Sequence, residues 1–209
     1  MNFKELQPPI LELPPNQTWY RVQRKTTRPG SVRLNGFILP PLGGLTGRFD
    51  LADEPTAYVA DSTETALYES LFRREVRACH WDKLQERVLA RFHTVAGLRL
   101  VDLRGIEERY PVLQSLRYDA TQSFAADCRK NNLHGIVYAS AQHPYHDCVC
   151  LFKAGLDGAR RASTTPLVQR GTGNLHKAVL AAARGSQVPI IRETKAQNSG
   201  LLGTEKSVS

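Results

Sequence analysis

Residues Thr56–Phe72 predict a short strand that leads almost directly into a helix, and this unit limits how the rest of the chain can fold. Ala57–Ala60 is a short, mostly apolar run typical of a strand, and the helix is expected over Ser62–Arg74. Asp61 is expected to cap the helix N-terminus, with Glu64 three residues later completing a capping box.

The predicted helix carries one carboxylate, Glu69, away from its apolar face. Leu67 and Leu71 are four residues apart and therefore share the face that packs on the core. At about 100° per residue, Glu69 lies roughly 200° around the helix from Leu67. The simplest interpretation of Glu69 is a surface ion pair with Arg73, four residues further on, worth a few tenths of a kcal/mol.

Length and composition indicate one ordinary domain. The chain has 209 residues, of which 41% are hydrophobic and 23% charged, which is typical of a single soluble domain with a real core. It has no apolar run near the roughly 18 residues of a membrane span, and its N-terminus lacks a secretory apolar region, so a cytoplasmic location is expected. In that compartment the four cysteines are expected to be reduced thiols. They are Cys79, Cys128, Cys148 and Cys150.

The chain is basic, with a formal charge of +8 and a pI near 9.5. Residues 155–209 hold eight Lys/Arg against three Asp/Glu. This balance admits a nucleic acid, an acidic protein partner or an anionic small molecule such as a dinucleotide. Residues 155–209 contain no Phe, Tyr or Trp, so the alternative of a basic nucleic-acid-binding module that stacks on bases is disfavoured.

The distribution of proline and glycine divides the chain. Residues 1–17 contain four prolines and are expected to form an extended N-terminal segment, followed by a single domain over 18–194. Residues 195–209 have little apolar content and are expected to form a disordered tail. Arg28–Gly47 has no clear period and is expected to be a long loop, either a binding loop or a loose insertion.

Short elements of both types follow one another without strict alternation. Strands are expected at Thr18–Val22, Arg87–His93, Arg99–Leu103, Gly135–Ala139, Cys148–Lys153 and Val188–Ile191, and helices at Ala120–Asn132 and Asn174–Arg184. This order predicts an α+β fold with a mainly antiparallel or mixed sheet. The phosphate-binding loops GxGxxG and GxxxxGK[ST] are absent from the sequence.

Five different short motifs follow one another between Trp19 and Phe152. They are Trp19-Tyr20-Arg21, Gly47-Arg48-Phe49, Tyr58-Val59-Ala60, Ala66-Leu67-Tyr68-Glu69 and Tyr138-Ala139-Ser140-Ala141. In order and spacing they resemble the RES domain family, which is named for an Arg, a Glu and a Ser. Members of that family are toxins of toxin–antitoxin pairs that consume NAD.

The resemblance implies a fold, a reaction and a partner. The implied fold is similar to ADP-ribosyltransferases of the diphtheria-toxin type, with flanking helices and an NAD cleft between split sheets that needs no glycine-rich loop. The implied reaction degrades NAD⁺ at the nicotinamide–ribose bond by hydrolysis or phosphorolysis, with transfer of ADP-ribose to a protein as the alternative; no metal is expected. The implied partner is a small antitoxin with an Xre-like helix-turn-helix, which covers the NAD entrance.

The resemblance also implies roles for individual residues. Glu69 would stabilise the charge that develops on the ribose, and Ser140 would line the site and support that carboxylate. Arg21, and with less support Arg48, would bind the phosphates or a ribose hydroxyl through their guanidinium groups, and Tyr58 would stack on the nicotinamide ring. Without the resemblance, Arg21 would simply end a strand, Tyr58 would be a core residue and Ser140 a turn residue.

Two other chemistries are suggested by the segment around His143. It holds four potential zinc ligands: His143, His146, Cys148 and Cys150. Zinc sites combine two separated ligand pairs, and on one strand the two sulfurs would lie about 7 Å apart. We therefore expect both cysteines to be small core residues. Ser140 with a nearby histidine could form a nucleophile and its base, but no G-x-S-x-G turn surrounds it.

Overall fold

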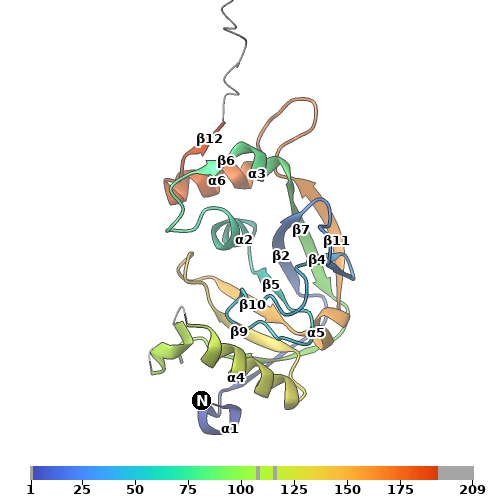
Figure 1. The fold of residues 1–209 in the computed structure, drawn as a ribbon, viewed down its shortest axis with the longest axis vertical. Coiled ribbons are helices and arrows are strands. Elements are labelled where there is room, and N and C mark those ends of the chain that lie inside the picture. Colours follow the sequence, from blue (N-terminus) through green and yellow to red (C-terminus); the bar gives the residue numbers. More distant parts are fainter. Residues whose placement is uncertain (1, 107–108, 115–116, 193–209) are drawn as a thin grey trace, which may run out of the picture.

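A single mixed sheet of eight strands organises the computed structural model, which describes residues 2–106, 109–114 and 117–192. The strand order is β1-β8-β9-β10-β5-β2-β7-β11, and the sheet curls along this order (Figure 1). Its strands are β1 (Ile10–Leu13), β2 (Thr18–Arg24), β5 (Ala57–Ala60), β7 (Arg87–Thr94), β8 (Leu98–Asp102), β9 (Gly135–Ala139), β10 (Asp147–Leu151) and β11 (Ala159–Pro166). Within this sheet β8 and β9 are parallel, and the other neighbours pair in antiparallel fashion.

The sheet is split between β2 and β5. These strands pair only at Tyr20 and Ala60, whereas β2 pairs with β7 over the seven residues Thr18–Arg24. Beyond Tyr20, the edge of β2 that faces β5 is therefore not covered by that strand. A split of this kind opens a cleft within one sheet, and the predicted α+β class with split sheets is confirmed.

Three longer helices lie along one face of the sheet. They are α2 (Thr63–Ser70), α4 (Asp119–Lys130) and α6 (Lys177–Ser186). In Figure 1, α4 lies beside β9 at one end of the molecule, and α6 lies at the other end with α2 between them. No helix in the described part of the chain is long and apolar enough to cross a membrane.

The remaining elements are short. They are α1 (Phe3–Leu6), α3 (Trp81–Gln85), α5 (Lys153–Asp157), the 3₁₀ helix η1 (Pro111–Gln114), a hairpin of β3 (Val32–Leu34) and β4 (Phe37–Leu39), and a parallel pair of β6 (Cys79–His80) and β12 (Ile190–Ile191).

Both faces of the sheet are covered by core. On the helix side, Val22 and Leu89 pack in one cluster with Leu67 of α2 and Val179 of α6. On the other side, the β3–β4 hairpin covers the sheet, and Phe37 stacks on Phe92 of β7 with ring centroids 3.7 Å apart. Burial on both faces explains why β9 and β10 consist mainly of apolar residues rather than alternating ones.

Several segments differ from the sequence-based expectation. The N-terminal segment is not simply extended, because it forms α1 and then β1, which pairs with β8 at the edge of the sheet. The expected long loop over Arg28–Gly47 contains the β3–β4 hairpin, and β11 was not predicted at all. The expected disordered tail, residues 195–209, lies outside the described residues.

The prediction for the start of α2 was wrong by one residue. Ser62 is the N-cap, and its side chain accepts a hydrogen bond from the Thr65 amide at 3.1 Å. Asp61 instead accepts the Asp147 amide at 2.9 Å and bonds His146 Nδ1 at 3.0 Å. Both Asp and Ser can cap a helix, and here contacts with β10 and the preceding turn occupy Asp61.

Candidate active site

A cleft of about 580 Å³ opens where β2 and β5 separate. This is a volume typical of small-molecule sites. Five ionisable side chains of Arg or Glu line the cleft: Arg21, Arg48, Glu69, Arg73 and Arg87. Four cations around a single carboxylate favour an anionic ligand that carries more than one negative charge.

The carboxylate of Glu69 is held from behind by Ser140. The Ser140 hydroxyl donates to Glu69 Oε1 at 2.6 Å, and its oxygen accepts the amides of Gln142 and His143 at 3.2 and 2.9 Å. Ser140 follows β9, is only 8% exposed and is not among the residues that line the cleft. It therefore orients Glu69, which reaches the cleft from α2, and does not form part of the cleft wall itself.

The expected surface pair between Glu69 and Arg73 does not form. Arg73 Nε donates to the main-chain oxygen of Glu69 at 2.7 Å, and its guanidinium pairs with Glu75 at 3.6 Å. The last turn of α2 therefore directs Arg73 past the carboxylate. Among the described residues, the side-chain partner of the Glu69 carboxylate is Ser140.

Arg21 bridges the split in the sheet. Its Nη1 donates to the main-chain oxygen of Tyr58 on β5 at 2.6 Å, while its Nε is buried without a hydrogen-bond partner. Burial lowers the pKa of Arg21, and the nearby carboxylate of Asp50 opposes this shift. The cation is thus partly desolvated, and its Nη2 makes no hydrogen bond to another described residue.

The loop that carries Arg48 is held tightly on both sides. Tyr58 Oη accepts the Phe49 amide at 2.8 Å and donates to Asp50, whose other oxygen accepts the Gly47 amide at 2.6 Å. A β-carbon on Gly47 would collide with Tyr58 Oη and Asp50, so the turn leaves room only for glycine.

Helix α4 fixes the same loop from the other direction. Thr121 Oγ1 donates to the main-chain oxygen of Arg48 at 2.6 Å, and Gln122 donates to that of Gly47 at 2.9 Å. The side chain of Arg48 has no hydrogen bond or ion pair with another described residue, and it lines the cleft. A fixed main chain with a free guanidinium is suited to binding a ligand anion.

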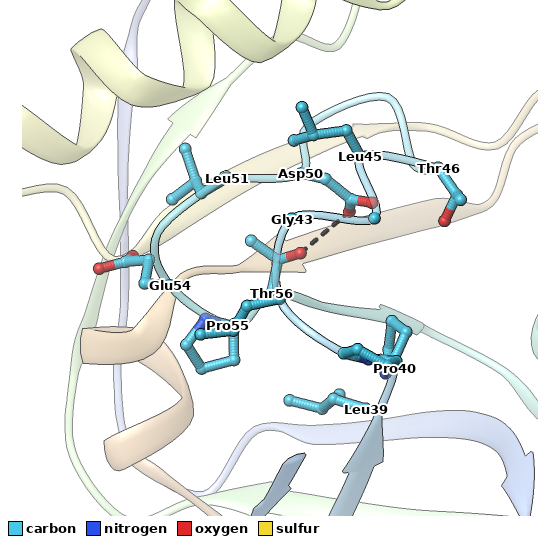
Figure 2. Close-up of a pocket in the computed structure, with 13 residues that line it drawn as sticks. Leu39, Pro40, Gly43, Leu45, Thr46, Asp50, Leu51, Glu54, Pro55 and Thr56 are labelled. Carbon is cyan, nitrogen blue, oxygen red and sulfur yellow. Dashed lines mark hydrogen bonds between the residues drawn. The ribbon is translucent and has the colours of Figure 1, made fainter. Parts of the chain in front are cut away.

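A small pocket of about 20 Å³ lies next to this loop, under residues 40–46 (Figure 2). Figure 2 shows Thr56 and Asp50 pointing toward one another, with Thr56 Oγ1 donating to Asp50 Oδ1 at 2.9 Å. The pocket has room for about one water molecule. Asp50 therefore organises the loop beside the cleft, and the small pocket is not a substrate site.

Two tyrosines form the aromatic part of the cleft wall. The hydroxyl of Tyr58 is committed to Asp50 and Phe49, and its ring lines the cleft. Tyr138 also lines the cleft, and its pKa is raised mainly by burial and further by the charge of Glu69. Both phenols therefore remain neutral.

Sequence reasoning did not identify Arg87 and did not assign a role to Tyr138. Tyr138 was part of a recognised motif, and its position in the sequence next to Ser140 was a usable signal. Arg87 opens a predicted strand, and no local pattern distinguishes it from other strand-end arginines. Its place in the cleft depends on the split between β2 and β5.

The histidines after β9 have structural partners that exclude the alternative of a serine nucleophile. His143 approaches Ser140 through its main-chain amide, whereas its ring Nδ1 bonds Thr65 Oγ1 at 2.8 Å. The His143 ring stacks on that of His146 at 3.8 Å, and His146 bonds Asp61. Neither ring is therefore positioned as a base for Ser140.

The described residues contain no set of ligands for a zinc site, which the sequence had suggested as an alternative. No group of three or more His, Cys, Asp or Glu in that part of the chain could hold a metal ion. Cys148 and Cys150 are buried on β10, as expected for small core residues, and Cys150 Sγ lies 3.8 Å from the main-chain oxygen of Phe49. All four cysteines are free thiols.

Comparisons with known proteins agree with this geometry. The sequence profile of the RES domain matches residues 18–170. Among solved structures, the fold is similar to a chain of the M. tuberculosis MbcT–MbcA toxin–antitoxin complex, with a TM-score of 0.54 and 15% identity, covering 75% of this chain and 86% of that chain. No curated protein matches the sequence. The predicted α+β fold with a split mixed sheet is thereby confirmed.

Proposed function

Because the chain belongs to the RES domain family, we propose that it degrades NAD⁺ at the nicotinamide–ribose bond and acts as the toxin of a toxin–antitoxin pair. The observation that carries this proposal is the single carboxylate, Glu69, held by Ser140 in a cleft with four arginines. The net positive cleft suits a dinucleotide whose two phosphates are negative, and the one carboxylate suits the cationic end of the same molecule.

The chemistry requires one group of this kind. When the bond between nicotinamide and ribose C1′ breaks, its electron pair goes to the ring nitrogen, so the leaving group departs as neutral nicotinamide without an added proton. Positive charge then develops on the ribose, as in glycoside cleavage through an oxocarbenium-like transition state. Glu69 would stabilise that charge, and Ser140 fixes its orientation before the reaction begins.

The other cleft residues would bind the substrate. Arg21 and Arg48, with donors left free, would bind the diphosphate. Tyr58 would present its ring to the nicotinamide, since its hydroxyl is already bonded to Asp50. The arrangement is compatible with three acceptors of the ADP-ribose group: water in hydrolysis, phosphate in phosphorolysis, or a side chain of a protein.

A protein partner follows from the same proposal. The structural neighbour is part of a toxin–antitoxin complex, and an enzyme that consumes NAD⁺ in the cytoplasm needs an inhibitor. We propose an Xre-like antitoxin that covers the cleft.

One experiment tests the reaction and identifies the acceptor. Purified protein is incubated with NAD⁺ in buffers with and without phosphate, and products are identified by mass. We expect stoichiometric free nicotinamide together with ADP-ribose or its 1″-phosphate, and no release by the Glu69→Gln variant. ADP-ribose attached to an added protein would assign transfer instead. No free nicotinamide under any of these conditions would refute the proposed reaction.

A further inference from the structure

Arg87 is a half-buried arginine, and one of its guanidinium nitrogens is buried without a hydrogen-bond partner. It is the first residue of β7, faces Arg24 of β2 in register, and lines the cleft. Its Nε is buried without a hydrogen-bond partner, and no ion pair joins its guanidinium to another described residue. The adjacent acid, Glu86, pairs with Arg24 at 2.9 Å instead.

The surroundings of Arg87 disfavour its charge. Burial is the main cause that lowers the pKa of Arg87, and the positive charges of Arg24 and Arg28 lower it further against a smaller opposing effect of Glu86. A buried donor without a partner costs about 1–3 kcal/mol, and more when it is charged. A chain that keeps such a group in a cleft is expected to use it.

The buried nitrogens without a partner include two from arginines that line the cleft. In the described part of the chain, three buried side-chain nitrogens lack a hydrogen-bond partner: Trp19 Nε1, Arg21 Nε and Arg87 Nε. Two of the three belong to arginines that line the cleft. Arg21 and Arg87 come from neighbouring strands, and the charge of Arg87 is among those that lower the pKa of Arg21.

The position of these arginines is set by the split in the sheet. Arg21 on β2 comes directly after the point where β5 leaves β2, and Arg87 on β7 pairs with Arg24, further along β2. In the β2–β7 register Arg21 is opposite Ala90 and Arg87 is opposite Arg24, and both arginines line the cleft. An anion there would receive donors from two strands at once.

On the premise that the cleft binds a dinucleotide as proposed above, we infer that Arg87 is a second phosphate-binding residue, so that Arg21 and Arg87 together bind the two phosphates of the diphosphate. Arg87 is not one of the three residues, an Arg, a Glu and a Ser, for which the family is named. The ligand of this pair of arginines is a nucleoside diphosphate, and the second phosphate is expected to increase its affinity for the cleft.

The test measures binding of ADP, AMP and adenosine to the full chain by calorimetry, without any turnover. The wild type should bind ADP more tightly than AMP, and AMP more tightly than adenosine. Arg87→Gln should weaken ADP binding about ten- to a hundredfold, as expected for the loss of a hydrogen bond to a charged group, and should affect adenosine little. The matched control is Arg91→Gln, an exposed arginine on the same strand that does not line the cleft; it should bind ADP as the wild type does.

Thermal unfolding separates binding from structure. Removal of a half-buried cation near the positive charges of Arg24 and Arg28 should leave the Tm of Arg87→Gln unchanged or raise it. A lower Tm together with weaker ADP binding would make Arg87 a structural residue, and undiminished ADP binding by the folded variant would equally overturn the inference. If Arg87→Gln does not fold, Arg87→Lys decides: it keeps the charge but loses the planar fork, and equal ADP affinity would refute the role.

The two proposals can fail separately. If the wild type binds ADP through Arg87 but releases no nicotinamide from NAD⁺, the reaction is wrong and the phosphate subsite stands. If nicotinamide is released and the folded Arg87→Gln variant keeps the wild-type KM for NAD⁺, the subsite is wrong and the reaction stands.

Discussion

Replacing Glu69 by glutamine removes the one carboxylate among the described residues that line the cleft and leaves the shape of the cleft. The Ser140 hydroxyl donates to Glu69 Oε1 at 2.6 Å, and a glutamine amide oxygen can accept the same hydrogen bond. Arg73 bonds the main-chain oxygen of Glu69 and not its carboxylate, so no ion pair is broken. We therefore expect little change in Tm.

The effect on catalysis should be large, because the lost charge acts only when positive charge appears on the ribose. One preorganised electrostatic group of this type is typically worth about 10²- to 10³-fold in kcat, or roughly 2.7–4 kcal/mol. The KM for NAD⁺ should change little, since the interaction is made in the transition state. The assay is the initial rate of nicotinamide release over a range of NAD⁺ concentrations.

The matched control is Glu64→Gln on the same helix. Glu64 accepts a hydrogen bond from Thr63 at 2.6 Å and does not line the cleft, so the same loss of charge should leave kcat within about twofold. If folded Glu69→Gln and Glu64→Gln both keep the wild-type rate, Glu69 is an ordinary helix residue. If both lose the same factor, the general charge of the helix, and not the position of Glu69, is responsible.

Three further changes test the supports of the site. Ser140→Ala should lower kcat about tenfold with little change in KM, because the carboxylate remains but loses its orienting donor; a change in KM alone, in the same rate assay, would contradict this role. Gly47→Ala should raise the KM for NAD⁺, since a β-carbon collides with Tyr58 Oη and displaces Arg48, and a variant with wild-type kinetics and Tm would show that the loop can adjust. His143→Asn should make the protein more resistant to acid. Burial, and then the charge of the stacked His146, lowers the pKa of His143 in the folded protein. The unfolded chain therefore binds this proton more readily, and the wild type loses stability as pH falls below about 6.5. Denaturant unfolding at pH 7.5, 6.5 and 5.5 should show a smaller loss for the variant, and identical losses would exclude His143 as a source.

The elements that the sequence predicted are those with a local signal. Ala57–Ala60, Gly135–Ala139 and the helix around Phe124 follow from apolar runs and from spacing within one element, and the structure has all three. The edge strand β11 has six consecutive exposed residues, so it carries no hydrophobic pattern that could reveal a strand. Its pairing with β7 is a long-range property.

The same distinction applies to the site. Glu69 and Ser140 were found through their motifs, and the structure joins them by a hydrogen bond across 71 residues of sequence. Asp61 was misjudged because its competing partner, the Asp147 amide, is 86 residues away. Arg87 could not be found for the corresponding reason, because its place in the cleft is created by the divergence of two other strands.

The acidic residue and the arginines of the cleft are held in opposite ways. This difference bears on which of them contribute to catalysis and which to substrate binding. Glu69 is restrained by a buried serine that is itself held by two main-chain amides, so the carboxylate is oriented before any ligand arrives. Arg21 and Arg87 are left with unpaired, buried nitrogens, which lowers the stability of the empty protein. A group that stabilises a transition state must be preorganised, whereas unpaired cations gain their partners only when an anion binds. If the cleft binds NAD⁺ as proposed, the free energy recovered by pairing these arginines is available to position the ribose against a carboxylate that does not have to move.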